Sequence, residues 1–275
     1  MSVPLPLVTV VVPSFNEDPH IVRASLESVR VQTFADFECI VVDESTKPEL
    51  AEACRALCAV DPRFIYIHPD ERLGLPASLN LAIGKARGQL IARFDSDDVC
   101  MPERLALQVE FLQSHPEISL VGGALDIINS EGQLLSRRRY PMTPTEIGKD
   151  MQLTTAVAHP TVMYRKVAIE QHGGYNLAFR FSEDLDLWLR WMNAGLQFAN
   201  LSQVLVQYRQ DSTQRSSAHW RFNLRARIVN FSSQYLVRRI IGIACIATWV
   251  VMPNNLQEQL FKALILRRRR QEVAN

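Results

Sequence analysis

The sequence predicts an α/β protein built on a doubly wound, mostly parallel sheet. Apolar runs rich in β-branched residues, such as residues 7–12, are typical of strands that are covered on both faces. Between these runs, apolar residues recur at helical spacing, and strand and helix alternate four times before residue 115. Such alternation favours parallel strands joined by right-handed helical crossovers.

The elements follow in a regular order. The first helix is expected after Asp18-Pro19, because Asp caps helix N-termini and Pro is tolerated in the first turn. Pro48 and Pro102 begin the second and fourth helices, and Gly88 closes the third. The strands of this Rossmann-like half are expected at residues 7–12, 37–42, 64–67 and 90–94.

The regular alternation loosens after residue 115. Short apolar runs near Leu120, Ile127 and Val162 predict strands of a mixed sheet. Residues 183–191 have helical spacing, and residues 204–209 resemble a late strand.

Composition bounds the class of protein. Hydrophobic residues make up 47% of the 275 residues and charged residues 21%, which is typical of a globular chain. The five cysteines show no CxxC pair, so we expect reduced thiols. Residues 1–6 lack the regions of a signal peptide, and we therefore expect a cytoplasmic protein.

Polar clusters follow three of the predicted strands. Residues 13–17 follow the first strand, Asp43-Glu44-Ser45 the second, and Asp95-Ser96-Asp97-Asp98 the fourth. Ligands of doubly wound sheets bind beyond the carboxyl ends of the strands, where these clusters converge. Neither GxGxxG nor GxxxxGK[ST] follows the first strand, so glycine-rich phosphate loops are excluded there.

Two acidic pairs carry the expected chemistry. Asp95 and Asp97 can hold a hard divalent cation that binds phosphate oxygens; the alternative is a solvated turn that caps the next helix. Glu183-Asp184 opens a predicted helix and can supply a general base. The pair can equally do no more than complement the helix dipole, and position alone leaves both interpretations open.

Taken together, the motifs resemble glycosyltransferase family 2, whose members have the GT-A fold. The resemblance covers roughly three quarters of the chain, and the order and spacing of its pieces make it specific. The matching segments are Val10-Val11-Val12-Pro13-Ser14-Phe15-Asn16-Glu17, Val41-Val42-Asp43-Glu44-Ser45, Gly74-Leu75 with Ser78-Leu79-Asn80, Lys85-Ala86-Arg87-Gly88, Ile91-Ala92-Arg93-Phe94-Asp95-Ser96-Asp97-Asp98, His159-Pro160, Gly173-Gly174-Tyr175 and Glu183-Asp184-Leu185-Asp186-Leu187-Trp188-Leu189-Arg190.

The resemblance implies a role for each site residue. The metal ligand is Asp97, with Asp95, for Mn²⁺ or Mg²⁺, and the general base of an inverting displacement is Asp184, next to Glu183. Asp43 is expected to accept a hydrogen bond from the N–H of uracil. The residues implied in nucleotide-sugar binding are Pro13, Ser14, Phe15, Asn16, Glu17, Asp43, Arg72, Asn80, Asp95 and Ser96.

Some positions depart from the family pattern. Phe15 stands where Tyr is frequent, and Glu44 where a second Asp is usual. Gln210-Asp211 replaces a His that many relatives have after Tyr208-Arg209, so the identity of a third metal ligand is left open.

His159 precedes Pro160 and an apolar strand, and we expect a structural histidine there. Leu187 stands in place of a Gln that processive sugar polymerases have, which favours transfer of a single sugar.

The C-terminal segment is basic and amphipathic. From Arg221 to Asn275 there are ten basic and two acidic residues. The apolar run 240–252 is shorter than the roughly 20 residues that span a bilayer. Arg238-Arg239 precede this run, and Arg267–Arg270 follow the next apolar stretch. This pattern favours contact with an anionic membrane surface over nucleic-acid binding; the alternatives are a helical hairpin packed on the catalytic domain or a dimer interface.

The sequence therefore predicts a GT-A catalytic domain over residues 1–215 and a helical tail over residues 216–275. Residues 1–115 are expected to bind the nucleotide-sugar donor, a UDP-sugar, and residues 116–215 the acceptor. The family implies a lipid-linked glycan acceptor in bacterial surface polysaccharide or lipopolysaccharide assembly, at the inner face of the plasma membrane. The rival hypotheses are a sugar nucleotidyltransferase and a catalytically inert, membrane-associated scaffold on the same fold.

Overall fold

The computed structural model describes residues 5–210 and 217–252. Its first half is the predicted doubly wound unit, with four parallel strands in the order β3-β2-β1-β4. The strands are β1(Val8–Ser14), β2(Phe37–Asp43), β3(Phe64–Ile67) and β4(Leu90–Arg93). The helices are α1(Pro19–Arg30), α2(Pro48–Cys58), α3(Leu75–Lys85) and α4(Arg104–Ser114).

Local signals set several of these bounds. The Asp18 side chain accepts a hydrogen bond from the N–H of His20 at 2.8 Å, which confirms the predicted cap of α1. Helix α4 begins at Arg104, two residues after the predicted start at Pro102, because Pro102 and Glu103 form a turn that follows the short strand β5(Val99–Cys100). Four of the five cysteines are buried and all five are free thiols, as expected for a reduced protein.

The second half continues the sheet with mixed directions. Strand β8(Met163–Arg165) is antiparallel to both β4 and β6(Ile118–Ile128), and β9(Gln197–Arg209) runs parallel to β6. The runs near Leu120 and Ile127 thus belong to one long strand rather than two. Strand β7(Leu134–Arg138) pairs with the end of β6, and β5 pairs with β9.

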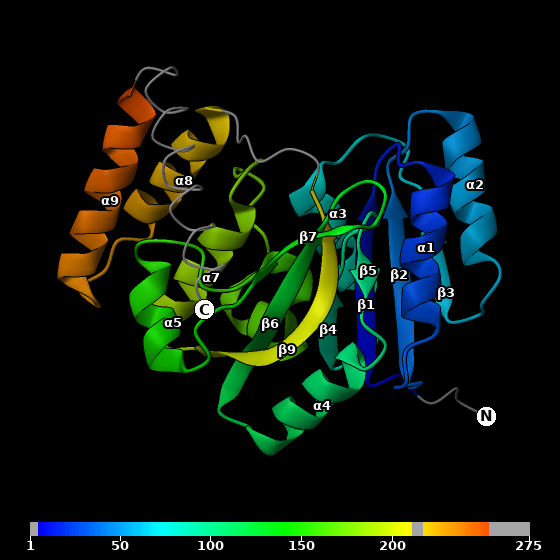
Figure 1. Cartoon of the computed structure of the whole chain (residues 1–275), viewed down its shortest axis with the longest axis horizontal. Coiled ribbons are helices and arrows are strands. Elements are labelled where there is room, and N and C mark those ends of the chain that lie inside the picture. The colour runs from blue at the N-terminus through cyan, green and yellow to red at the C-terminus, as the bar shows by residue number, and fades with distance from the viewer. Residues whose placement is uncertain (1–4, 211–216, 253–275) are drawn as a thin grey trace.

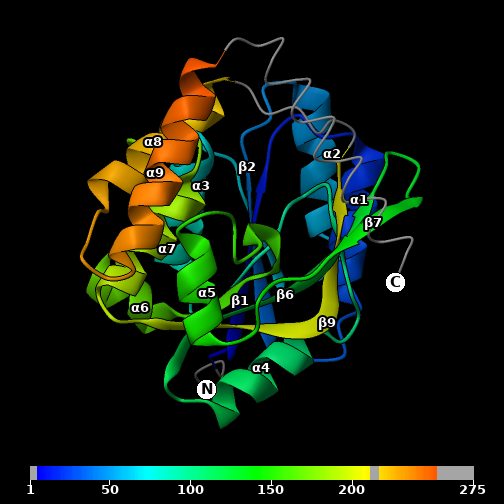
Figure 2. The same cartoon turned by 60° about the vertical axis from the view of Figure 1, so that its left-hand side comes forward.

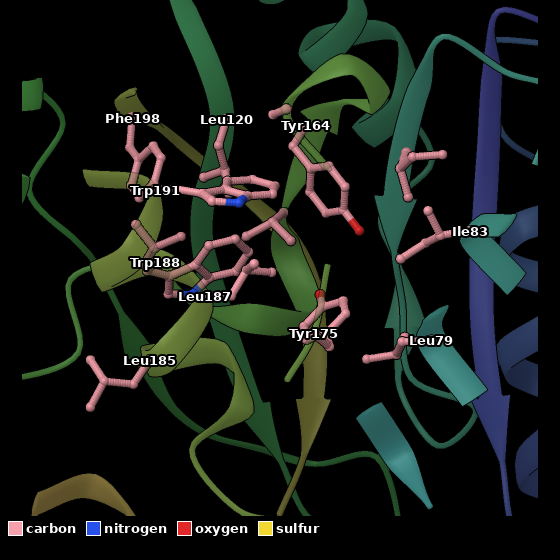
Figure 3. Packing of buried hydrophobic residues seen from close by; sticks show 14 of the residues in the cluster. Leu79, Ile83, Leu120, Tyr164, Tyr175, Leu185, Leu187, Trp188, Trp191 and Phe198 are labelled. Carbon is pink, nitrogen blue, oxygen red and sulfur yellow. The ribbon is translucent and has the colours of Figure 1, made fainter. Parts of the chain in front are cut away.

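Helices cover both faces of the sheet (Figures 1 and 2). Along β1, Val10 and Val12 pack with α1, α2 and α4, whereas Val11 packs with α3 on the other face. That second face also carries α5(Pro144–Met151), α6(Lys166–His172) and α7(Glu183–Asn193). Its centre is an aromatic cluster in which Trp188 and Trp191 of α7 meet Tyr164 and Phe198 (Figure 3).

Two further helices, α8(Ser217–Val229) and α9(Leu236–Val251), dock beside α5 and α7 (Figure 2). The buried guanidinium of Arg227 donates hydrogen bonds to the backbone carbonyls of Met151 and Gln152, at the C-terminus of α5. Arg239 donates to the carbonyl of Asn230 and to the Asn193 side chain. Within the described ranges, no helix has both the length and the apolar character needed to cross a bilayer.

Candidate functional site

The carboxyl ends of β1, β2 and β4 lie next to one another, and the polar clusters converge there as predicted. Asn16, in the loop after β1, adopts a left-handed conformation with φ 53°. Its side-chain oxygen accepts a hydrogen bond from the N–H of Thr46 at 3.0 Å, and its own N–H donates to the Ser45 hydroxyl at 2.9 Å. The loop of residues 14–17 is therefore fixed to the loop that follows β2.

Asp43, at the end of β2, is fully buried. Its Oδ1 accepts hydrogen bonds from the hydroxyl of Ser45 at 2.6 Å and from the Ser45 N–H at 3.1 Å, and its Oδ2 accepts from the Tyr66 hydroxyl at 2.9 Å. A carboxylate offers about four acceptor positions, so these bonds occupy most of them. The structure thus gives Asp43 an intramolecular role that the sequence did not predict.

Phe15 and Arg72 form one side of the rim. The guanidinium carbon of Arg72 lies 3.8 Å from the centre of the Phe15 ring, a cation–π contact. Ser14 is buried, whereas Pro13 and Glu17 are partly exposed. Phe15 and Arg72, two of the residues predicted to bind the nucleotide-sugar, are therefore held against each other at the edge of the sheet.

Asn80 makes contacts that sequence analysis missed. Its side chain donates to the carbonyl of Tyr175 at 2.8 Å and accepts from the Tyr175 N–H at 2.9 Å. A Cβ atom at Gly174 would lie 2.6 Å from the Asn80 side-chain oxygen, so glycine permits this close approach. Asn80 thereby ties α3 to the segment that leads towards α7, and this contact occupies polar atoms that we had assigned to the nucleotide.

The acidic segment after β4 forms a compact cluster. Carboxylate oxygens of Asp95, Asp97 and Asp98 lie within 4.8 Å of one another. Arg93 forms an ion pair with Asp95. Burial, together with the charges of Asp95 and Glu17, raises the pKa of Asp97 to about 7. Carboxylates crowded in this way repel one another, and a divalent cation relieves the repulsion, so these residues fit the predicted metal. Ser96 is buried between them.

Asp98 was absent from the predicted ligands. It is fully buried, and its Oδ1 accepts the backbone N–H of Arg209 at 2.8 Å. Among the described residues its Oδ2 has no hydrogen-bond partner. Burial is the main cause that raises the pKa of its carboxyl, followed by the charges of Asp95 and Asp97. A buried, unsatisfied carboxylate oxygen needs a proton or a cation. The position of Asp98 directly after Asp97, at the end of a buried strand, is the sequence feature that could have identified it as a further ligand. Of the proposed replacements for the family His, Asp211 lies outside the described residues.

Glu183 and Asp184 form the N-terminus of α7, after Ser182 in a left-handed conformation with φ 58°. Glu183 is buried, and desolvation together with the charge of Asp184 raises its pKa to about 8. Asp184 is partly exposed, and its Oδ1 accepts the N–H of Leu185 at 2.7 Å. Of the two acids, Asp184 is thus the one that an external hydroxyl group can approach.

His159 is buried behind this pair. Its Nε2 lies 2.8 Å from the Tyr175 hydroxyl, and its Nδ1 lies 3.7 Å from Glu183 Oε1. Burial lowers the pKa of His159 well below its usual value, while the pKa of Glu183 is raised, so both groups are neutral near pH 7 and form no ion pair. This environment agrees with the expected structural histidine.

The C-terminal half of α7 fixes a neighbouring loop. Arg190 donates hydrogen bonds to the carbonyls of His172 and Gly174, at 3.1 and 2.6 Å. The indole N–H of Trp191 donates to the carbonyl of Gly173 at 3.2 Å. The Gly173-Gly174-Tyr175 motif is therefore held by α7 from one side and by Asn80 from the other.

Comparisons with known proteins agree with this geometry. The model of "Glycosyl transferase family 2" matches residues 9–173. The O-antigen biosynthesis glycosyltransferase WbnJ of Escherichia coli is 34% identical over 218 residues, which cover 78% of this chain and 84% of that protein. The amylovoran biosynthesis glycosyltransferase AmsE of Erwinia amylovora is 30% identical, with 71% and 73% covered.

Solved structures show the same fold at low sequence identity. The mannosyltransferase PcManGT of Pyrobaculum calidifontis, in complex with GDP-Man and Mn²⁺, has a TM-score of 0.65 at 16% identity and covers 95% of this chain and 80% of its own. The fragment of S. aureus TarS in complex with UDP-GlcNAc has a TM-score of 0.65 at 17% identity, with 88% and 71% covered. The family match and the fold agree, and this chain belongs to glycosyltransferase family 2, with a GT-A-like fold and a helical C-terminal part.

Proposed function

We propose that this chain is a metal-dependent, inverting glycosyltransferase that moves one sugar from a UDP-sugar to a hydroxyl group of a glycan. The observation that supports the proposal most is the acidic cluster of Asp95, Asp97 and Asp98, which lies beside the loops after β1 and β2. Nucleotide-sugars are also bound in the complexes of PcManGT and TarS.

Asp97 and Asp95 are the proposed ligands of Mn²⁺ or Mg²⁺, with Asp98 as a further oxygen donor. Bound there, the cation offsets the negative charge that develops on the diphosphate leaving group. Arg72, above the ring of Phe15, supplies a positive charge to the same nucleotide. The chain's own task on this side is to hold the donor and to keep its leaving group in a fixed position.

Asp184 is the proposed general base, which takes the proton from the acceptor hydroxyl. Glu183 stays protonated near pH 7, because its pKa is about 8, and it therefore lacks the charge that a base needs. A single base acting opposite the leaving group implies one in-line displacement, so the anomeric configuration inverts.

The acceptor is proposed to be a lipid-linked glycan of surface polysaccharide assembly. The similarity to WbnJ and AmsE, whose names refer to O-antigen and amylovoran biosynthesis, supports this class. A set of exposed apolar side chains on α8, on α9 and in the turn between them, which we call the α8–α9 apolar face, supports contact with a membrane. Its members are Ile228, Val229, Phe231, Leu236, Val237, Ile240, Ile241 and Val251. We propose peripheral attachment at the inner face of the plasma membrane.

The arginines around this face play different parts. Arg238 is exposed and lies 3.9 Å from Asp150, whereas Arg239 is buried and holds α9 against the domain. Arg267–Arg270 lie outside the described residues. Within the described residues, the proposed membrane contact therefore rests on insertion of apolar side chains, with Arg238 exposed beside them.

Membrane attachment is tested by sedimentation with vesicles that contain anionic lipid. We expect the wild type to sediment with the vesicles and Val237→Ser/Ile240→Ser to stay in the supernatant. Leu134→Ser/Leu135→Ser is the matched control, because it removes two exposed apolar side chains from β7. Equal sedimentation of all three proteins would contradict the proposed role of the α8–α9 apolar face.

The donor site is tested by calorimetric titration of UDP, with and without Mn²⁺, on the wild type and on Asp97→Ala. We expect binding that requires Mn²⁺ and is lost in the variant. Asp126→Ala is a control, since Asp126 is an acid paired with Arg137 on the β6–β7 hairpin. Absence of UDP binding in the wild type would refute a UDP-sugar donor and would leave two hypotheses, a donor with another nucleotide or the inert scaffold.

A further inference from the structure

Glu44, at the end of β2, holds the start of α3. Its side chain is buried, and its Oε2 accepts hydrogen bonds from the backbone N–H groups of Leu73 and Gly74, both at 2.8 Å. Its Oε1 accepts the hydroxyl of Ser78. All three donors belong to one junction between a loop and a helix, so one carboxylate fixes that junction.

The junction lacks a cap of its own. Gly74 is the N-cap of α3, with φ 80°, and offers no side chain to accept the free N–H groups of the first turn. The Glu44 carboxylate instead accepts the N–H groups of the two residues just before the helix, and it places a negative charge at the positive end of the helix dipole. An aspartate at this position would be shorter by one carbon–carbon bond, about 1.5 Å, and would not reach the same donors without a shift of the backbone.

The same contact fixes the backbone of Arg72. The N–H of Leu73 belongs to the peptide bond that follows Arg72, and Glu44 therefore sets the plane of that peptide. The guanidinium projects over Phe15, with its carbon 3.8 Å from the ring centre. Across residues 5–210 and 217–252, no hydrogen bond or ion pair engages this guanidinium, so its N–H groups are available to an anion or a carbonyl group.

We propose that Glu44 is a positioning residue for donor binding: it orients residues 72–74 so that Arg72 stacks on Phe15 and faces the nucleotide. This inference rests on the proposed function. Glu44 itself does not touch the donor; its effect reaches the nucleotide through Arg72. Loss of Glu44 therefore weakens UDP binding only while Arg72 is present.

A double-mutant cycle on UDP binding in the presence of Mn²⁺ tests this coupling. We expect Glu44→Gln and Arg72→Ala each to weaken binding about tenfold, the size of one charge-assisted contact. The double variant should bind no more weakly than Arg72→Ala alone, because both changes remove the same interaction. Glu71→Gln, which removes an exposed negative charge from the same loop, should bind UDP like the wild type.

Three results would overturn the inference. Additive losses in the double variant would show that Glu44 acts independently of Arg72. Wild-type affinity in Glu44→Gln would show that Glu44 does not contribute to UDP binding. Hydrogen exchange of the Leu73 and Gly74 amides in the wild type tests the contact without any substitution, and exchange as fast as in an exposed loop would also overturn it. A wild type that binds no UDP would remove the proposed function together with this inference, whereas binding with additive losses removes the inference alone.

Discussion

A single methyl group at Gly242 should separate α9 from the domain. A Cβ atom at this position would lie 2.0 Å from the carbonyl oxygen of Gln152, which is a backbone atom and cannot swing away. Carbon and oxygen atoms approach to about 3.3 Å, so Gly242→Ala requires a shift of more than about 1 Å at this contact. Because Arg239 lies three residues away on the same helix, that shift also disturbs its hydrogen bonds to Asn230 and Asn193.

The magnitude follows from opposing terms. Alanine is favoured over glycine in a helix interior by about 1 kcal/mol. Overpacking costs about 1–3 kcal/mol, and each disturbed hydrogen bond of a charged group costs about 1.5–3 kcal/mol. At the lower end of these terms, the net expectation for Gly242→Ala is a loss of roughly 3 kcal/mol in the free energy of unfolding, or about 6–12 °C in Tm for a chain of this size.

The assay is thermal and urea unfolding of two alanine variants. Gly84→Ala is the matched control, because Gly84 lies in α3 and a Cβ atom there meets nothing within 4 Å. We expect Gly84→Ala to raise Tm by up to about 4 °C through helix propensity alone. If Gly242→Ala raised Tm in the same way, the close contact between α9 and the carbonyl of Gln152 would be refuted.

Two further predictions concern the acids of α7. Asp184→Asn should lower the transfer rate roughly 10²–10⁴-fold while UDP affinity stays unchanged; a parallel loss of UDP affinity would assign Asp184 to donor binding. Burial raises the pKa of Glu183 from 4.5 to about 8, so the folded state retains a proton that the unfolded state releases. Stability should therefore fall as pH rises from about 4.5 to 8, by at most about 5 kcal/mol, and Glu183→Gln should flatten this dependence in urea unfolding at pH 5 and pH 9. Parallel pH profiles of the two proteins would contradict it.

Local patterns predicted the first half of the fold well. The strands β1 to β4 are apolar on both faces, and Asp18 and Pro19 mark the start of α1, so short stretches of sequence contain the needed information. The second half depends on pairing between distant segments. Strand β9 begins at Gln197, seven residues before the predicted start, because residues 197–201 pair with β6 although their buried and exposed side chains do not alternate regularly.

The site shows the same division. The motifs brought Asp43, Asp95 and Asp97 to one edge because strand order alone decides which ends are neighbours. The side-chain contacts of Asn80 and Glu44 were missed, because their partners lie 95 and about 30 residues away in sequence and no local pattern marks them. Polar residues beside a predicted site thus include those that bind a ligand and those that hold the loops that bind it.

Helix α7 connects the proposed base to the C-terminal helices. Asp184 lies in its first turn. Asp186, in the same turn, accepts a hydrogen bond from the side chain of Asn230 at 2.9 Å. Farther along, Asn193 accepts one from Arg239 of α9. Phe222 of α8 packs on the same hydrophobic cluster as α7. Because buried polar contacts of this kind are costly to break, α7, α8 and the first turns of α9 should move as one body. We therefore expect a restraint on the α8–α9 apolar face to reach the helix that carries Asp184, so the proposed attachment would be mechanically linked to the orientation of the proposed base.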